Sequence, residues 1–218
     1  MKRLMALVLL LAVLPAAAGA EMWDLFCREQ NRDDGKTAVV IYLEGSSWEA
    51  EKTILGNGLY EDVNILCVCS RNNEYDFSAI WRERDMLGLG ENIVYRMWQE
   101  FPEAAEVVII GFSNGGYAMD AVYRKCREYG IRTRCAVCMD GYPKKFGLQE
   151  IEADGVPLMY AVSRTEKAGH ITGRTKEHIK NIGGALVKQY ALEHGELEKD
   201  AEVQRDVWDF IQEAGYGD

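Results

Sequence analysis

The sequence predicts a three-layer α/β/α sandwich, in which helices cover both faces of a mostly parallel sheet of six strands. Short apolar runs recur along the chain, and longer segments with helical spacing separate them. Strands that alternate with helices form a parallel sheet, because each crossover returns the chain to the same end of the sheet. The 218 residues, 48% of them hydrophobic and 28% charged, suit one compact domain.

The six predicted strands are short runs rich in β-branched residues. The first is Ala38–Leu43, which is apolar throughout and is followed at once by Gly45. Continuous apolar runs of this length are typical of strands that are buried on both faces of a parallel sheet. The remaining predicted strands are 63–69, 107–110, 135–139, 157–162 and 186–192.

The helices are predicted between these strands. Residues 80–101 carry a helical pattern that ends before Pro102 and is interrupted near Gly88 and Gly90, so it predicts one helix or two. The last helix has Val203, Val207 and two further apolar residues on one side. The other expected helices are 115–129 and 175–182, and the last spans 200–214.

The first 20 residues have the composition of an export signal. Lys2 and Arg3 precede an apolar run over residues 4–14, and small residues end at Ala20. A membrane anchor would need about 20 consecutive apolar residues, so cleavage is favoured over anchoring. We therefore expect a signal peptide at 1–20, a single domain over 21–218 without a membrane anchor, and a secreted or periplasmic protein.

The charge excludes some partners. The formal net charge of −10 and the absence of a basic stripe argue against nucleic-acid binding, which requires clustered Lys and Arg.

Cys135 and Cys138 have the spacing of a zinc pair but lie in an apolar run with no second pair, so neither a metal nor a cofactor is expected. Export permits disulfides. The alternatives are buried thiols or, if one bridge forms, a bond between Cys126 and Cys135.

The motif that indicates chemistry is Gly111-Phe112-Ser113-Asn114-Gly115. It has the form Gly-x-Ser-x-Gly and lies directly after the strand 107–110 and directly before a helical segment. This context is the one that a nucleophile elbow requires, in which a sharp turn presents the serine hydroxyl at the carboxyl end of the sheet.

On this motif and on the order of its elements, the sequence resembles the α/β-hydrolase family, in the minimal six-stranded form of small secreted esterases, cutinases and lipases. The resemblance implies that the leading antiparallel edge strands are missing, since so few residues precede position 38. It implies Ser113 as nucleophile and His194, in the loop after the last strand, as base. The acid is expected in the loop after strand 157–162, where Glu166 stands, and Asp140 at the end of strand 135–139 is the alternative.

The resemblance also implies an oxyanion hole formed by the backbone N–H groups of Asn114 and Ser46. The function it implies is a secreted serine hydrolase that cleaves carboxylic esters through an acyl-enzyme, acting on a small molecule or the end of a polymer. An acyltransferase, a peptidase or a non-catalytic binding protein with the same fold are alternatives. The short stretch 140–156 favours an open cleft, and the cations between 164 and 176 are either a binding site for an anionic group or a solvated surface.

Overall fold

The computed structural model describes residues 26–31, 37–45, 53–55, 57–69, 77, 80, 83–141, 148–163 and 185–216. Within these residues the chain forms a seven-stranded sheet of order β1-β3-β2-β4-β5-β6-β7. All six predicted strands are present in it. The strands are β1 (Phe26–Gln30), β2 (Ala38–Leu43), β3 (Asn64–Cys69), β4 (Glu106–Phe112), β5 (Arg132–Met139), β6 (Leu158–Ser163) and β7 (Leu186–Tyr190).

The seventh strand, β1, corrects the expectation that no antiparallel edge strand precedes the sheet. It pairs antiparallel with β3 through residues 26–30, while every other neighbouring pair is parallel. The Gln30 amide donates to the carbonyls of Tyr60 and Val63, so a polar side chain fastens this strand. A strand that ends in Arg-Glu-Gln lacks the apolar run by which the other strands are recognised.

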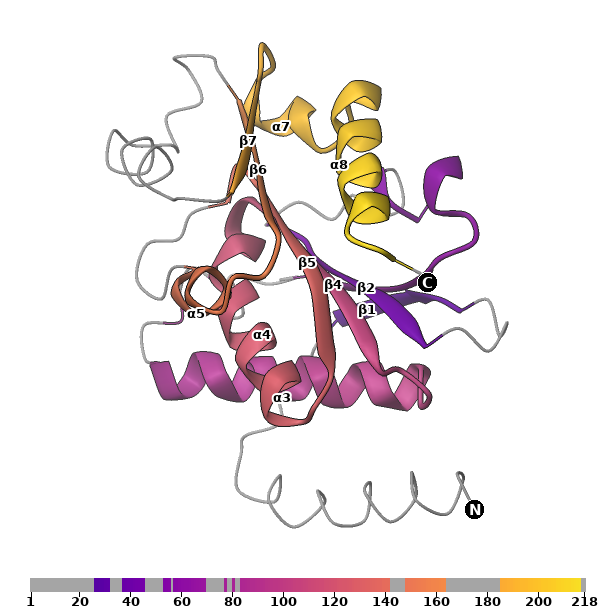
Figure 1. Ribbon diagram of the computed structural model, residues 1–218, viewed down its shortest axis with the longest axis vertical. Helices are drawn as coiled ribbons and strands as arrows, with labels where there is room; N and C mark the ends of the chain where they lie inside the picture. The colour runs from indigo at the N-terminus through magenta and orange to yellow at the C-terminus, as the bar shows by residue number, and fades with distance from the viewer. Residues whose placement is uncertain are drawn as a thin grey trace.

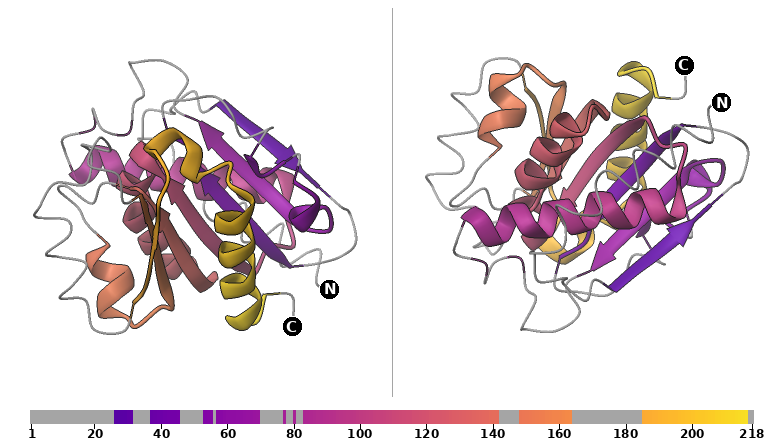
Figure 2. Two further views of the ribbon diagram at one scale, coloured as in Figure 1. Left: turned by 90° about the horizontal axis from the view of Figure 1, so that it is seen from above. Right: turned by 90° about the horizontal axis from the view of Figure 1, so that it is seen from below.

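The helices form two layers, one on each face of the sheet. Figures 1 and 2 show α3 (Glu83–Glu100) and α4 (Met119–Glu128) against one face and α8 (Ala201–Glu213) against the other. Between them the chain forms short helices at the ends of strands. These are η1 (Gly58–Tyr60), η3 (Ser113–Tyr117), α5 (Gln149–Ala153) and α7 (His194–Leu197).

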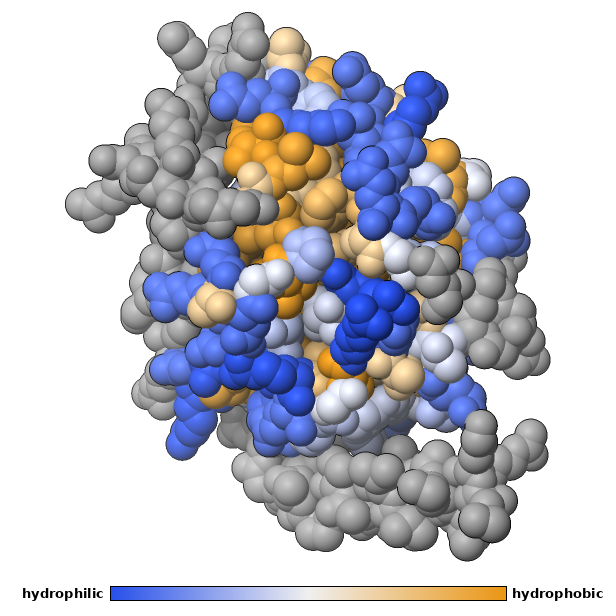
Figure 3. Space-filling model, viewed as in Figure 1, coloured by the Kyte–Doolittle hydropathy of each residue, from blue (hydrophilic) through white to orange (hydrophobic). Residues whose placement is uncertain are grey.

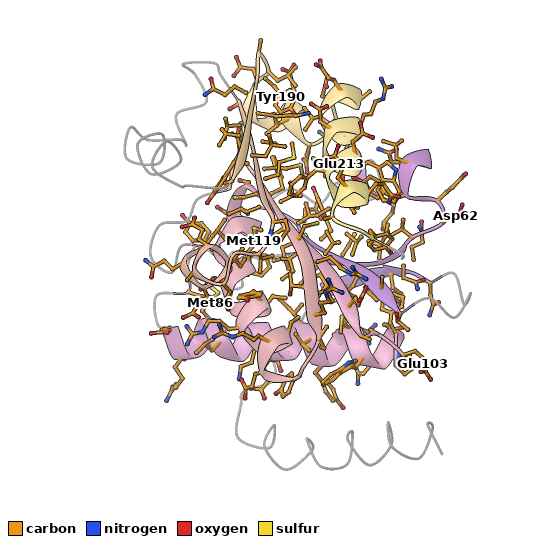
Figure 4. The ribbon with its side chains drawn as sticks, in the orientation of Figure 1. Asp62, Met86, Glu103, Met119, Tyr190 and Glu213 are labelled. Atoms are coloured by element: carbon orange, nitrogen blue, oxygen red, sulfur yellow. The ribbon has the colours of Figure 1, made fainter. Side chains whose placement is uncertain are left out.

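Strand alternation divides the apolar side chains between two cores. In β2, Val39 and Ile41 face the core beneath α3 and α4, and Val40 and Tyr42 face the core beneath α8. Met86 and Met119, labelled in Figure 4, lie in the first core at 1% and 0% exposure. Burial on both faces explains why the central strands are apolar at every position.

Helix α3 is continuous through Gly88 and Gly90, so the interruption that the two glycines suggested does not occur. A Cβ atom on Gly90 would lie 2.6 Å from the carbonyl oxygen of Ala121 in α4. Gly90 is therefore the point at which two helix backbones make close contact. The glycine serves this packing rather than a helix end.

The cysteines form no disulfide. All six are free, and five of them are buried. Cys126 lies in the core beneath α4, and Cys135 lies in the core on the opposite face of the sheet, so the sheet itself separates the predicted pair. The buried-thiol alternative is confirmed, and a Cys126–Cys135 bond is wrong.

Two predicted segments, the export signal 1–20 and the helix 175–182, lie outside the described residues, as do the cations between 164 and 176. In the part of the chain that the structure describes, no helix has both the length and the apolar character needed to cross a bilayer. The described surface is mainly polar. Figure 3 shows an apolar strip in the area of β6 and β7. Among the described residues, Leu186 in β7 is the exposed large hydrophobic side chain, at 41%.

Candidate active site

Ser113 stands at the turn between β4 and η3, in a backbone conformation that side chains rarely adopt. Its φ is 51°, in the left-handed region, whereas Phe112 directly before it is extended at φ −105°. A non-glycine residue with positive φ is strained, and such residues persist where the surrounding structure over-determines them. The turn lifts Ser113 out of the sheet at the carboxyl end of β4, as the nucleophile-elbow hypothesis requires.

Glycines surround the elbow because three chain segments meet there without space for side chains. A Cβ on Gly115 would lie 1.8 Å from the carbonyl oxygen of Leu43 at the end of β2. A Cβ on Gly111 would lie 2.6 Å from the sulfur of Met119, and one on Gly45 would lie 2.9 Å from the Cβ of Ser113. The glycines of the motif thus allow the turn to pack against β2 and α4.

His194 faces Ser113 from the far end of the chain. Its Nε2 lies 2.9 Å from the Ser113 hydroxyl oxygen, across 81 positions of sequence. His194 is the first residue of α7, which a reciprocal capping box of Glu193 and Glu196 closes at its N-terminal end. The imidazole has an exposed fraction of 23%, so it can be reached from solvent.

Asp140 holds the other nitrogen of the same ring. The carboxylate Oδ2 lies 3.0 Å from His194 Nδ1, and Oδ1 accepts a hydrogen bond from the Ser163 backbone N–H at 2.8 Å. Asp140 directly follows β5 in a left-handed conformation, at φ 41°, and its side chain is fully buried. Both strained non-glycine residues of the described chain, Ser113 and Asp140, therefore contact His194.

Of the two predicted acids, Asp140 is the one that the described structure places against His194. Glu166 lies outside the described residues, and the single Nδ1 of His194 is directed to Asp140. Gly141, directly after Asp140, packs tightly against its neighbours. A Cβ there would lie 2.4 Å from Cys138 Sγ and 3.5 Å from the Ser113 carbonyl oxygen. The end of β5 is thus drawn against the elbow, within reach of the histidine.

Phe112 is a further residue of the site, which the sequence motif marks only as a variable position. Its ring stacks on the imidazole of His194, with centroids 5.0 Å apart and planes 20° apart. Phe112 is 2% exposed and belongs to the core on the α8 face. The residue directly before Ser113 thus gives His194 a flat apolar surface.

Of the two predicted oxyanion donors, the structure describes Asn114 but not Ser46. Asn114 follows Ser113 within η3, at the position from which its N–H would serve a reacting carbonyl. Ser46 lies outside the described residues, but Gly45, directly before it, packs against Ser113. Among the described residues, no group of three or more His, Cys, Asp or Glu side chains is arranged to hold a metal ion.

Comparison with known proteins gives structural matches only. No family model matches the chain, and no curated protein matches it in sequence. A carboxylesterase structure of Nitrososphaera gargenis matches at a TM-score of 0.59 and 11% identity, over 87% of this chain and 94% of that one. A hydrolase of Oleispira antarctica, olei00960, matches at 0.59 and 11%, over 85% and 94%.

A third match is a type II thioesterase, YbtT, from the yersiniabactin biosynthetic pathway. It has a TM-score of 0.58 and 10% identity, and the match covers 86% of this chain and 98% of that one. Coverage is nearly complete in each case, so the likeness concerns the whole domain rather than one motif. Together with the parallel sheet and the turn at Ser113, these matches show that the chain has the α/β-hydrolase fold.

Proposed function

We propose that this protein is a serine hydrolase that cleaves carboxylic esters through an acyl-enzyme. The observation that carries the proposal is the hydrogen-bonded chain from Ser113 through His194 to Asp140, with contacts of 2.9 and 3.0 Å. A serine hydroxyl becomes a useful nucleophile only when a base removes its proton, and a carboxylate orients that base. The esterase and thioesterase neighbours support the same reaction class.

In the first half of the reaction, Ser113 Oγ attacks the substrate carbonyl carbon, and its proton passes to His194 Nε2. The carbonyl oxygen becomes an oxyanion, which the Asn114 N–H and, in our proposal, the Ser46 N–H stabilise. When the tetrahedral intermediate collapses, the bond to the leaving alkoxide breaks, and the alkoxide takes the proton from His194. The products of this half are an alcohol and an ester of Ser113.

In the second half, water replaces the alcohol. His194 Nε2 accepts a proton from the water as its oxygen bonds to the acyl carbon, and the proton then returns to Ser113 Oγ as the carboxylic acid leaves. Asp140 keeps the Nδ1–H tautomer and stabilises the imidazolium that forms in each half. The Ser163 N–H, 2.8 Å from Asp140 Oδ1, holds the carboxylate in the orientation this requires.

The segment between β5 and β6 bears on the substrate. Because it does not form a separate lid, we propose a substrate with a small acyl group, or an ester at the end of a larger molecule. Its helix α5 is docked on α4, because Asp120 accepts hydrogen bonds from the N–H groups of Glu150 and Ile151. The Tyr123 hydroxyl also donates to Asp154 just after α5, at 2.6 Å. A helix held in this way does not form a separate lid domain, and we propose that the cleft opens to solvent.

The proposal is tested with p-nitrophenyl acetate and butyrate and with a fluorophosphonate label. We expect hydrolysis by the wild type and, in Ser113→Ala, loss of both hydrolysis and labelling. Equal hydrolysis by the two proteins would exclude Ser113 as nucleophile. No hydrolysis and no labelling in the wild type would favour a non-catalytic protein of the same fold.

We also propose that residues 1–20 direct export and are removed. The support is the pattern of cations, apolar run and small residues, which is independent of the fold. Expression of the full chain in a bacterium, followed by mass spectrometry of the periplasmic and culture fractions, tests it. A mature N-terminus at Glu21 is expected, and an intact Met1 in the cytoplasmic fraction alone would contradict it.

A further inference from the structure

A polar cluster is buried beneath the site, on the α8 face of the sheet. The Tyr42 hydroxyl donates to the Glu198 carboxylate at 3.0 Å, across 156 positions of sequence. Tyr42 and Glu198 are each 1% exposed, and Glu44 is 0% exposed. Burying a carboxylate costs free energy unless hydrogen bonds compensate for it, and the hydrogen bond from Tyr42 is one that does so for Glu198.

The Tyr42 hydroxyl also contacts a residue that follows the predicted oxyanion donor Ser46 in sequence. Tyr42 is near the end of β2, which leads through Gly45 to Ser46. Thr53, beyond that loop and 1% exposed, hydrogen-bonds to the same hydroxyl. Thr53 is thus linked to β2, the strand that leads toward Ser46.

Glu198 connects the Tyr42 hydroxyl to the helix of the histidine. Glu198 is the C-cap of α7, the four-residue helix that begins at His194. Its carboxylate binds Tyr42, and its carbonyl oxygen accepts a hydrogen bond from the Gln204 amide at 2.5 Å. A helix of one turn is not stable by itself. The position of His194 therefore depends on the contacts that fasten the two ends of α7.

We propose that Tyr42 is a positioning residue whose hydroxyl sets α7, and with it His194, relative to Ser113 and to the end of β2. This role rests on the proposed function and adds to it a group that touches neither substrate nor the reacting atoms. Burial, with Glu198 and Glu44 nearby, raises the pKa of Tyr42 well above its ordinary value. The hydroxyl is therefore a permanent donor to Glu198.

The chain offers a matched control in Tyr160. Tyr160 is also 1% exposed, and its hydroxyl donates to a glutamate, Glu152, at the same distance of 3.0 Å. It lies in β6 and faces the core on the other side of the sheet, away from α7. Tyr42→Phe and Tyr160→Phe thus remove the same chemical group from two tyrosines of equal exposure, although Glu152 is only partly buried and Glu198 is buried.

The experiment measures three properties of both variants: the melting temperature, kcat and KM for p-nitrophenyl acetate, and hydrogen exchange of residues 194–199. We expect similar losses in melting temperature. Only Tyr42→Phe should lower kcat, by about 10- to 100-fold with KM unchanged, since small displacements of a reacting group have effects of this size. Only Tyr42→Phe should also accelerate exchange in α7.

A second pair of variants controls for a general loss of structure. Glu198→Gln retains an oxygen that accepts from Tyr42, and Glu198→Leu does not. We expect kcat to be higher in Glu198→Gln than in Glu198→Leu. Equal kcat in these two, or equal kcat and exchange in the two tyrosine variants, would overturn the positioning role. Absence of Ser113-dependent turnover in the wild type would instead overturn the proposed function, and the exchange comparison would still decide whether Tyr42 holds α7.

Discussion

His194 Nδ1 lies 3.0 Å from Asp140 Oδ2, although the two residues are 54 positions apart and belong to different layers of the fold. The contact exists because β5 ends against the elbow and α7 begins beside it. Both oxygens of Asp140 are engaged, one by His194 and the other by the Ser163 N–H. The carboxylate is thus fixed before any substrate binds.

Replacement of Asp140 should therefore remove most of the activity. In Asp140→Asn the amide cannot stabilise the imidazolium and permits the wrong tautomer, so we expect kcat for p-nitrophenyl acetate to fall by about four orders of magnitude. Glu166→Gln is the comparison and should retain nearly full activity. The reverse order of the two variants would restore Glu166 as the acid.

The difference between these two acids shows what the sequence can predict about this protein. The motif around Ser113 is local, and the choice of His194, after the last strand, follows from the resemblance to the α/β-hydrolase family, so both could be proposed from the printed sequence. The acid depends on which strand end reaches the imidazole, a distance across the sheet that no local pattern encodes. The same holds for the stack of Phe112 on His194 and for the bond between Tyr42 and Glu198.

The fold shows a similar division. Buried strands such as β2 are recognisable because every residue is apolar, whereas the edge strand β1 is partly polar and is defined by its partner β3. Gly90 looks like a helix interruption in sequence, and only the contact with Ala121 reveals it as a packing position. Tertiary contact, rather than propensity, decides these cases.

The stack between Phe112 and His194 predicts a moderate effect on turnover. Phe112→Leu keeps an apolar side chain but removes the flat surface, and an aromatic pair is worth about 0.5–1.5 kcal/mol beyond its buried area. We expect kcat to fall by about two- to tenfold, with little change in KM. Phe101→Leu, at a buried position beyond the end of α3, is the control and should leave kcat unchanged. A kcat in Phe112→Leu equal to that of the wild type would mean that the stack does not orient the ring.

The contact between Gly115 and Leu43 predicts a large loss of stability. In Gly115→Ala the added Cβ would overlap the Leu43 carbonyl oxygen, a backbone atom that cannot move without shifting β2. Gly58→Ala is the control, because its Cβ would meet no atom within 4 Å. Urea unfolding should show a loss of several kcal/mol, or no folded protein, for Gly115→Ala and a change within about 1 kcal/mol for Gly58→Ala. Similar stability in both variants would contradict the packing at the elbow.

The free thiols predict resistance to a thiol reagent in the folded state. Burial raises the pKa of Cys126 and Cys135 to about 12, and that of Cys27, the one partly buried cysteine, also to about 12. The thiolate is the reactive form. Ellman's reagent should therefore react only slowly with the folded protein. In guanidinium chloride, where the protein is unfolded, it should react with all six thiols. A count of four after denaturation without reductant would reveal a disulfide.

The carboxyl of Asp120, which anchors α5, predicts a pH-dependent stability. Asp120 is 3% exposed, and burial raises its pKa from 3.8 to about 6, against the opposing effect of the hydrogen bonds from Ile151 and Glu150. The folded protein thus binds this proton more tightly than the unfolded chain does. The resulting stabilisation is complete below pH 3.8 and is lost as the pH rises through about 6.

Asp120→Asn removes this titration while its amide oxygen can still accept from the two N–H groups of α5. One pKa unit corresponds to about 1.4 kcal/mol, and part of the stabilisation is gained only below pH 4. The wild type should therefore lose about 2 kcal/mol relative to Asp120→Asn between pH 4 and pH 7. Urea unfolding of both proteins across this range gives the difference directly, since all other titrating groups are common to the two and cancel. A difference that stays constant with pH would mean that Asp120 is solvated, and one that grows in favour of the wild type as the pH rises would mean that the hydrogen bonds from α5 outweigh burial and lower the pKa of Asp120.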